Sequence, residues 1–303
     1  MTLSPVVLVL GPTASGKSAA AFEIARAMSG EIVSGDAFAV YRGLDIGTAK
    51  PPEAWRREVP HHLIDVVDAS EPYSAGKWAF QARAAVMEIE ARRRLPVIAG
   101  GSHFYLRSLL GELPGAAVAF PGLRSYFTAR QGPEENGRRK RALDLLDPSY
   151  SRTVPAGDTS RLERALEIVF STGRRVSERQ RPPAAFSGQR RWLKIALQIP
   201  REAIYTRIDR RIMEMWRAGW PREVEGLLRR NVPITASCFR AIGYREIARF
   251  LSGGKTEEET LAEITKKTRH LVKRQKTWLA SEPGVVFLPP EDAVESARRW
   301  IHP

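Results

Sequence analysis

The feature that most constrains this chain is a strand followed directly by a phosphate-binding loop. Residues 6–10 are five consecutive apolar residues, which predict a buried strand. Residues 11–18 read GPTASGKS, the complete G-x-x-x-x-G-K-S pattern of a P-loop. The alanine-rich stretch 19–28 then predicts a helix. This order of strand, loop and helix predicts an α/β fold with a parallel sheet flanked by helices.

The loop predicts a binding site for a polyphosphate-like group. Glycines let the backbone fold tightly around an anion, toward which the loop amides and the helix N-terminus point. Lys17 adds a mobile positive charge, and Ser18 offers a hydroxyl to Mg²⁺. The motif identifies neither the anion nor the reaction. We predict that all residues of the loop take part in binding the anion: Gly11, Pro12, Thr13, Ala14, Ser15, Gly16, Lys17 and Ser18.

The composition limits the class of protein. The 303 residues carry 48 Lys and Arg against 34 Asp and Glu, a net charge of +14. Such an excess is typical of a protein that holds a nucleic-acid backbone, although a merely basic surface gives the same total. No apolar run approaches the length of a membrane span, and we expect no signal peptide, because the first apolar run belongs to the predicted strand. The single cysteine, Cys238, excludes a disulfide framework and favours a packed thiol in a cytoplasmic protein.

The first third of the chain alternates strands and helices. Residues 31–34, 63–67 and 96–99 predict strands, and residues 74–94 carry apolar side chains at helical spacing. A second helix is expected to end at Leu110. We therefore take residues 1–113 as the first part of a P-loop core, with function at the carboxyl ends of its strands.

The pattern changes after residue 113. Residues 114–192 show no predicted strand and contain 15 basic against 8 acidic residues. Helices are expected at 123–130, 134–146 and 159–170, so we interpret this segment as an all-helical insertion. The P-loop core resumes over residues 193–303. Its expected elements are a strand at 192–197, helices at 201–218, 222–230, 241–251 and 256–281, a strand at 285–288 and a helix ending at 300.

Two further segments follow predicted strands and could carry chemistry. Asp36 comes just after the strand 31–34 and is either a turn or cap residue, a general base, or a partner of Mg²⁺. Gly100-Gly101-Ser102 is either a plain tight turn or a second loop that binds an oxyanion. His61 and His62 are adjacent and lack the spacing of metal ligands, so we expect them to have packing roles.

One predicted helix is strongly basic. Residues 266–278 contain six Lys or Arg and no Asp or Glu. Such a run is usually a solvated face, but the missing carboxylates and Trp278 favour a surface that binds phosphates.

Taken together, these residues resemble the tRNA dimethylallyltransferase family, P-loop enzymes that prenylate the adenosine beside the anticodon. The resemblance covers nearly the whole chain and implies a P-loop NTPase-like sheet with a helical tRNA-binding insertion. The DIGTAKP, R-x-x-R-A-L-E and KRQ-x-TW patterns are more specific than the P-loop. The matching blocks are GPTASGKS (11–18), VYRGLDIGTAKP (40–51), PHHLID (60–65), GGSHFYL (100–106), DTSRLERALEIVFSTG (158–173), AIGYRE (241–246) and TRHLVKRQKTW (268–278).

The resemblance implies a reaction and assigns roles. The P-loop holds the diphosphate of dimethylallyl diphosphate with Mg²⁺ on Ser18, and Lys17 stabilises the departing diphosphate. Ser102 and Arg211 are further expected diphosphate ligands. Asp36 acts as general base toward N6 of the adenosine on the 3′ side of the anticodon, which flips out of the RNA. The expected partners are dimethylallyl diphosphate and the anticodon stem-loop of tRNA, with the protein acting as a cytoplasmic monomer.

The resemblance also implies a set of tRNA contacts, carried over residue by residue. They are Asp36, Ala37, Phe38, Ala39, Ser102, Arg124, Thr159, Ser160, Arg161, Leu162, Glu163, Arg164, Arg240, Ala241, Ile242, Gly243, Tyr244, Arg245, Lys273, Arg274, Gln275, Lys276, Thr277, Trp278, Leu279 and Ala280.

The chain departs from the family pattern at two places. In the usual Asp-Ser-x-Gln-Val-Tyr pattern, this chain has Ala37 in place of the serine and Ala39 in place of the glutamine. At the second place, His103 and Phe104 replace a glycine and a leucine. Because Asp36 remains, we expect activity, with His103 or Phe104 packing on the base in place of the missing glutamine. Three other functions stay open: a small-molecule kinase, a prenyltransferase acting on free adenine nucleotides, and a catalytically weakened tRNA-binding protein.

Overall fold

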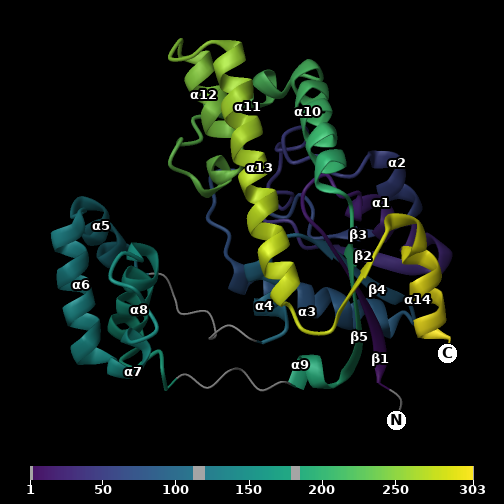
Figure 1. Cartoon of the computed structure of the whole chain (residues 1–303), viewed down its shortest axis with the longest axis horizontal. Helices are drawn as coiled ribbons and strands as arrows, with labels where there is room; N and C mark the ends of the chain where they lie inside the picture. Colours follow the sequence, from purple (N-terminus) through teal and green to yellow (C-terminus); the bar gives the residue numbers. More distant parts are fainter. Residues whose placement is uncertain (1–2, 112–119, 179–184, 303) are drawn as a thin grey trace. The chain divides into compact units, whose positions relative to one another are not determined.

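The computed structural model describes residues 3–111, 120–178 and 185–302. Within them the chain forms two compact units (Figure 1). The sheet unit comprises residues 1–110 and 186–303, and the helical unit comprises residues 111–185. The sequence placed the insertion at 114–192, but residues 190–192 belong to a strand of the sheet and residues 186–192 lie in the sheet unit.

The sheet unit is built on one parallel sheet of six strands, in the order β3-β2-β4-β1-β5-β6. The strand β1 lies between β4 and β5, so the P-loop leaves the middle of the sheet. The predicted fold class is therefore confirmed. The strands are β1 (Ser4–Leu10), β2 (Gly30–Ser34), β3 (His61–His62), β4 (Leu95–Gly100), β5 (Arg190–Leu197) and β6 (Val285–Leu288).

Helices cover both faces of the sheet and form the outer part of the same unit. None of the described helices is long and apolar enough to cross a membrane. The helices of the sheet unit are α1 (Lys17–Ala27), α2 (Glu53–Glu58), α3 (Ala75–Ala91), α4 (His103–Leu109), α9 (Ala185–Gly188), α10 (Arg201–Arg217), α11 (Trp220–Arg229), α12 (Tyr244–Leu251), α13 (Glu257–Ser281) and α14 (Ala293–Ile301), with 3₁₀ turns at Ser237–Arg240 and Pro290–Asp292.

The alternation of side chains along β1 gives the sheet its two cores. Val6, Leu8 and Leu10 face one hydrophobic cluster, which contains side chains of α3, α4, α10 and α13. Val7 and Val9 face the other, which is covered by α1 and α14. Successive side chains of a strand point to opposite faces, so a strand buried on both sides reads as a continuous apolar run.

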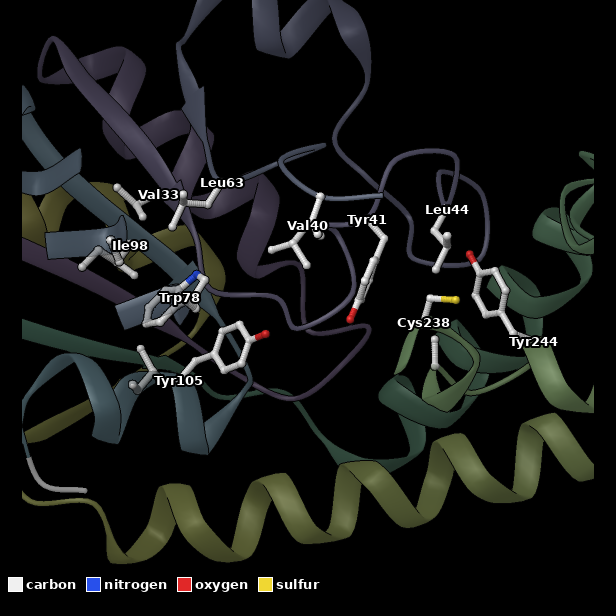
Figure 2. Packing of buried hydrophobic residues seen from close by; sticks show 14 of the residues in the cluster. Val33, Val40, Tyr41, Leu44, Leu63, Trp78, Ile98, Tyr105, Cys238 and Tyr244 are labelled. Atoms are coloured by element: carbon white, nitrogen blue, oxygen red, sulfur yellow. The ribbon is translucent and has the colours of Figure 1, made fainter. Parts of the chain in front are cut away.

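The first of these clusters extends away from the sheet into the outer helices. Figure 2 shows it running from Val33 and Ile98 past Tyr41 to Cys238 and Tyr244. Cys238 is fully buried, which agrees with the expectation of a packed thiol. The outer helices therefore share one core with the sheet, and this continuity fixes the positions of the loops between them.

One predicted strand is wrong. Residues 63–67 form a loop, and the short strand β3 lies just before them at His61–His62. Leu63 and Asp65 have φ angles of 61° and 57°, which are incompatible with a strand. The apolar residues Leu63 and Val67 reflect burial in the first cluster rather than pairing in the sheet.

The helical unit has its own core. Its elements are α5 (Pro121–Ala129), α6 (Pro133–Leu146), α7 (Pro148–Ser151) and α8 (Thr159–Thr172). Phe127, Leu143, Leu162 and Leu166 are among its buried apolar residues. The three longer helices were predicted within two residues at each end, and the single turn α7 was missed because four residues give no periodic pattern.

A buried carboxylate connects helices of this unit. Glu167 on α8 accepts hydrogen bonds from Nε of Arg124 at 2.6 Å and from the amide of Phe120 at 2.9 Å, and it also pairs with Arg164. Burial alone would raise the pKa of Glu167, but the hydrogen bonds from Arg124, Phe120 and Arg164 lower it to about 2.

We expect Glu167→Gln to destabilise the helical unit by about 2 kcal/mol, since it removes a charged acceptor of several hydrogen bonds. In the native protein this contribution is complete above pH 4.5 and is lost as the pH falls toward about 2, because the folded pKa is the lower one. Thermal melts at pH 7 and pH 3 measure both effects. The exposed Glu178, paired with Arg175 at 3.6 Å, provides the control Glu178→Gln, and equal losses in the two variants would contradict the expectation.

Candidate active site at the carboxyl ends of the strands

The P-loop presents free backbone amides at the start of α1. Gly16 caps this helix with a φ of 87°, a conformation that glycine adopts without strain. No side chain caps the helix, and its first turn contains no acidic residue. The unpaired N–H groups and the helix dipole therefore favour an anion at this end.

Lys17, Asp36 and Arg211 form a charged group beside the loop. Partial burial lowers the pKa of Lys17 to about 8, while the carboxylate of Asp36 opposes this shift and Arg211 adds to it. Burial likewise lowers the pKa of Arg211, and Asp36 again acts in the opposite direction. The sequence placed Lys17, Asp36 and Arg211 at one site, and the structure brings them together there. Two partly desolvated cations beside one carboxylate are suited to binding a multiply charged anion.

Asp36 uses one oxygen for structure and keeps the other available. Its Oδ1 accepts hydrogen bonds from the amides of Phe38 at 2.8 Å and Ala39 at 3.1 Å. Among the described residues, Oδ2 has no hydrogen-bond partner. The interpretation as a turn residue therefore applies to Oδ1, while Oδ2 stays available for the interpretations as a general base or as a partner of Mg²⁺.

The ends of β2 and β4 approach closely beside Asp36. The amide of Gly35 donates to Ala99 O at 2.7 Å, and a Cβ at Gly100 would lie 2.5 Å from Gly35 O. A side chain at position 100 would push the strands apart. Gly101 and Ser102 then connect the end of β4 at Gly100 to α4, whose N-cap is Ser102.

The side chain of Gln275 joins the segment after β4 to the P-loop. From α13, its Oε1 accepts from the amide of Thr13 at 2.9 Å, and its Nε2 donates to Gly101 O at 3.0 Å. Gln275 is 8% exposed. We predicted Gln275 as a tRNA contact, but the structure turns its side chain inward, where it holds two loops of the site.

We expect Gln275→Leu to loosen the P-loop, because the amide of Thr13 and the carbonyl of Gly101 both lose their partner. Two unsatisfied backbone groups cost about 2 kcal/mol of stability. The apparent affinity for inorganic diphosphate should fall with it, measured by titration calorimetry. Ser281→Ala, an exposed change at the end of the same helix, is the control, and identical affinities in both variants would refute the role given to Gln275.

A cavity of about 300 Å³ opens beside the P-loop, and we call it the loop cavity. Its charged end contains Lys17, Asp36, Lys50 and Arg211. The Lys50 ammonium is held by Tyr41 O at 2.7 Å and by Asp45 and Asp65, so it is already neutralised. Other lining residues give the cavity an apolar side: Ile32, Ala39, Pro51, Pro52, Trp55, Ile64 and Ala99.

A second cavity of about 140 Å³ also includes Asp36 in its lining and is mostly apolar. We call it the apolar cavity. The two cavities share five lining residues, Thr13, Ala14, Asp36, Thr48 and Arg211. The rest of its lining comes chiefly from Phe38, Gly47, Ile208, Ile212, Met215, Trp220, Ala241, Ile242, Thr268 and Leu271. Asp36 and Arg211 therefore lie where the anion-binding loop cavity meets the apolar cavity.

A basic hollow adjoins the apolar cavity at the surface. It is lined by Ile242, Lys267, His270, Lys273 and Arg274, and Ile242 also lines the apolar cavity. Lys273 and Arg274 form no ion pair within the described part of the chain. The basic hollow and the apolar cavity therefore share Ile242 as a common wall, which brings exposed cations of α13 close to the apolar cavity.

The cations of α13 are compensated more than the sequence suggested. Lys267 pairs with Glu246 at 2.5 Å and with Glu263 at 2.6 Å, and Arg269 pairs with Asp209 at 2.6 Å. The partner carboxylates lie on α10 and α12 or one turn earlier on α13. Lys267 and Arg269, which were not among the predicted tRNA contacts, are therefore neutralised within the protein.

The residues predicted to bind the diphosphate divide into two groups. Thr13, Ala14, Gly16, Lys17, Ser18 and Arg211 line the loop cavity. Gly11, Pro12 and Ser15 are buried behind them, and neither cavity includes Ser102 in its lining. The former group can touch a ligand directly, while the latter shapes the loop or its surroundings.

The residues of the sheet unit predicted to contact tRNA differ in exposure. Phe38, Ala241 and Ile242 line the apolar cavity, Ala39 lines the loop cavity, and Ala37 is half-buried. Gly243, Tyr244 and Leu279 are buried, so their side chains do not face the surface. Arg240, Lys273, Arg274, Lys276, Thr277 and Ala280 are exposed, and Arg245 is half-buried.

The predicted contacts in the helical unit are partly engaged within it. Arg124 and Arg164 bind Glu167, and Glu163 pairs with the buried Arg139 at 3.2 Å. Leu162 is fully buried. Thr159 accepts a hydrogen bond from Asn136, whereas Ser160 and Arg161 are exposed.

His103 and Phe104, which replace a glycine and a leucine of the family pattern, do not line either cavity. His103 stacks on Trp278, with ring centroids 4.9 Å apart, and Phe104 is 67% exposed. The structure therefore gives no support to the expectation that one of them packs on the base. His62 bonds to Glu31 at 2.7 Å and His61 to Val59 O at 2.7 Å, which agrees with packing roles.

The donor groups suit Mg²⁺ only as a partner of a bound phosphate. The described residues contain no group of three or more His, Cys, Asp and Glu that could hold a metal. Ser18 and Asp36 both line the loop cavity and supply hard oxygens. Mg²⁺ is commonly held by one or two protein oxygens together with phosphates and waters, so these residues fit it.

One residue near the site escaped the sequence reasoning. Glu223 on α11 accepts hydrogen bonds from the amides of Asp45, Ile46 and Gly47. Its neighbours in the sequence form an ordinary amphipathic helix, and no local pattern marks a carboxylate that binds a distant loop.

Comparison with known proteins agrees with this geometry. Residues 39–282 match the family model described as IPP transferase. The tRNA dimethylallyltransferase 1 of Trichlorobacter lovleyi is 40% identical over 287 residues, which cover 94% of both chains. The solved tRNA isopentenylpyrophosphate transferase of Bacillus halodurans matches with a TM-score of 0.69 at 28% identity, over 99% of this chain and 100% of that one. A eukaryotic dimethylallyltransferase acting on tRNA shares the fold, with a TM-score of 0.81 at 23% identity over 98% of this chain and 78% of that one.

Proposed function

The chain belongs to the IPP transferase family and transfers a dimethylallyl group to tRNA, and from this premise we propose the donor, the acceptor atom and the roles of the residues. The donor is dimethylallyl diphosphate. The acceptor is N6 of the adenosine on the 3′ side of the anticodon. The observation that carries the proposal is the position of Asp36, with a free Oδ2, where the loop cavity and the apolar cavity meet.

The P-loop is proposed to hold the leaving group. The amides at the start of α1, together with Lys17 and Arg211, bind the diphosphate of the donor in the loop cavity. The prenyl chain lies against the apolar side of that cavity. As the bond between carbon and the bridging oxygen breaks, negative charge grows on the diphosphate, and these cations and amides stabilise it. Mg²⁺ bound at Ser18 would neutralise further charge on the diphosphate.

The acceptor base is proposed to enter the apolar cavity from the basic hollow. Lys273 and Arg274 would contact phosphates, while Phe38 and Ile242 would face the base. N6 then attacks the allylic carbon, the diphosphate departs, and Asp36 Oδ2 takes the proton that N6 loses. Holding N6 in line with that carbon contributes much of the rate. We also propose that the protein acts as a cytoplasmic monomer.

Comparison of acceptors tests the proposal. The protein is incubated with dimethylallyl diphosphate and Mg²⁺ and with unmodified tRNA, AMP or no acceptor, and the products are read by nucleoside mass spectrometry. We expect a prenylated adenosine beside the anticodon and no product from AMP. Prenylated AMP would favour the free-nucleotide prenyltransferase, and tight tRNA binding without a product would favour a weakened binding protein. ATP turnover without RNA would favour a kinase.

A further inference from the structure

We propose that Glu223 is a positioning residue of the transfer reaction, whose carboxylate holds two walls of the apolar cavity at a fixed separation. The inference rests on the proposed function, because it takes the apolar cavity as the place of the acceptor base. Glu223 itself lines neither cavity, so it acts through the backbone that it binds.

The carboxylate of Glu223 gathers four donors. Its Oε2 accepts from the amides of Asp45 at 2.6 Å and Ile46 at 2.7 Å. Its Oε1 accepts from the amide of Gly47 at 3.1 Å and from the hydroxyl of Tyr244 at 2.6 Å. Three consecutive amides pointing at one charged group define the conformation of that loop, since charge-assisted hydrogen bonds are stronger than neutral ones.

The segments bound by Glu223 continue into the walls of the site. Beyond Asp45–Gly47, Thr48 lines both cavities. Tyr244 begins α12, and only Gly243 separates it from Ala241 and Ile242, which line the apolar cavity. One side chain on α11 therefore joins the loop that leads into Thr48 to the segment where the base is proposed to enter.

Trp220 packs tightly between the two segments that Glu223 joins. Trp220 is 2% exposed and lies between the two walls. A Cβ at Gly47 would lie 2.0 Å from Trp220 Nε1, and a Cβ at Gly243 would lie 2.0 Å from Trp220 Cζ2. Behind them, Leu44 and Tyr244 lie close together in the core (Figure 2). A change in the contacts of Glu223 must therefore move the walls rather than be absorbed locally.

Glu223→Gln tests the inference. The substitution preserves the size of the side chain but turns an NH₂ group toward backbone N–H donors, so the loop loses part of its attachment. With both substrates saturating, we expect the single-turnover rate of prenyl transfer to fall about tenfold or more. The Kd for tRNA, measured by filter binding, should stay within about twofold, because phosphate contacts dominate it.

Two further variants separate positioning from a general loss of stability. Glu223→Asp keeps the charge and both acceptor oxygens, and it should recover part of the lost rate. Glu225→Gln changes a half-buried glutamate of the same helix, paired with Arg229 at 2.7 Å, and should leave the rate unchanged. If Glu223→Gln does not fold, Tyr244→Phe removes only the fourth donor and should lower the rate about threefold.

A wild-type rate in Glu223→Gln, or in Tyr244→Phe when the former does not fold, measured well below the melting temperature, would overturn the inference. An equal loss in Glu225→Gln would overturn it as well. Prenyl transfer by the wild-type protein is measured first, and its absence would contradict the proposed function and not only the role of Glu223.

Discussion

Asp36→Asn is expected to reduce prenyl transfer to tRNA by about a thousandfold, within the range typical of a lost general base. The amide oxygen of asparagine can still accept hydrogen bonds from Phe38 and Ala39, so the turn is retained. What is lost is the second oxygen, which takes the proton from N6. The measurement is the single-turnover rate of transfer with saturating donor and tRNA.

The binding of both substrates provides the control for this variant. The Kd for tRNA and for inorganic diphosphate should change by no more than a few fold, because the cations that bind them remain. A rate within tenfold of wild type would show that another group takes the proton. A complete loss of tRNA binding would instead place Asp36 in recognition rather than catalysis.

Lys17→Met is expected to abolish donor binding and yet to stabilise the free protein at pH 7. Burial lowers the pKa of Lys17 from 10.5 to about 8, so the folded state holds this charge at a cost. Below pH 8 the cost is fully present, and it disappears as the pH rises toward 10.5, because the unfolded chain keeps the proton longer. Methionine has no charge to bury, so its melting temperature should exceed that of wild type at pH 7 and match it near pH 10.5.

The same pKa predicts the pH dependence of donor binding. Above about pH 8, Lys17 loses its proton in the free protein, and the affinity for inorganic diphosphate should fall. In Lys17→Met the affinity should be low at every pH. A wild-type affinity that stays constant from pH 7 to pH 9, measured by calorimetry, would contradict the role of this ammonium.

The elements of the sheet unit could be predicted well because their signals are local. Continuous apolar runs mark β1 and β4, which are buried on both faces, and the P-loop pattern fixes the start of α1 within two residues. Residues 63–67 misled the prediction because an apolar run shows burial but not pairing. Distinguishing the two requires the φ angles of Leu63 and Asp65, which the residue types do not specify.

The candidate site could be predicted where a residue acts on a ligand and not where it acts on the fold. Lys17, Asp36 and Arg211 do come together. Gln275 and Glu223 contact residues more than 170 positions away, and only the tertiary structure shows these contacts. Likewise, the carboxylates that pair with Lys267 and Arg269 lie mainly on other helices, so the charge of α13 cannot be judged from its own sequence.

The most direct test of the account is the fate of the oxygen that bridges carbon and phosphorus in the donor. The protein is incubated with unmodified tRNA, Mg²⁺ and dimethylallyl diphosphate carrying a heavy-oxygen label at that position. If the P-loop holds a leaving group while carbon is attacked, all the label appears in the released diphosphate, and the adenosine beside the anticodon gains one dimethylallyl group. Label retained in a prenyl alcohol, with the diphosphate group transferred to the RNA, would show attack at phosphorus and contradict the account.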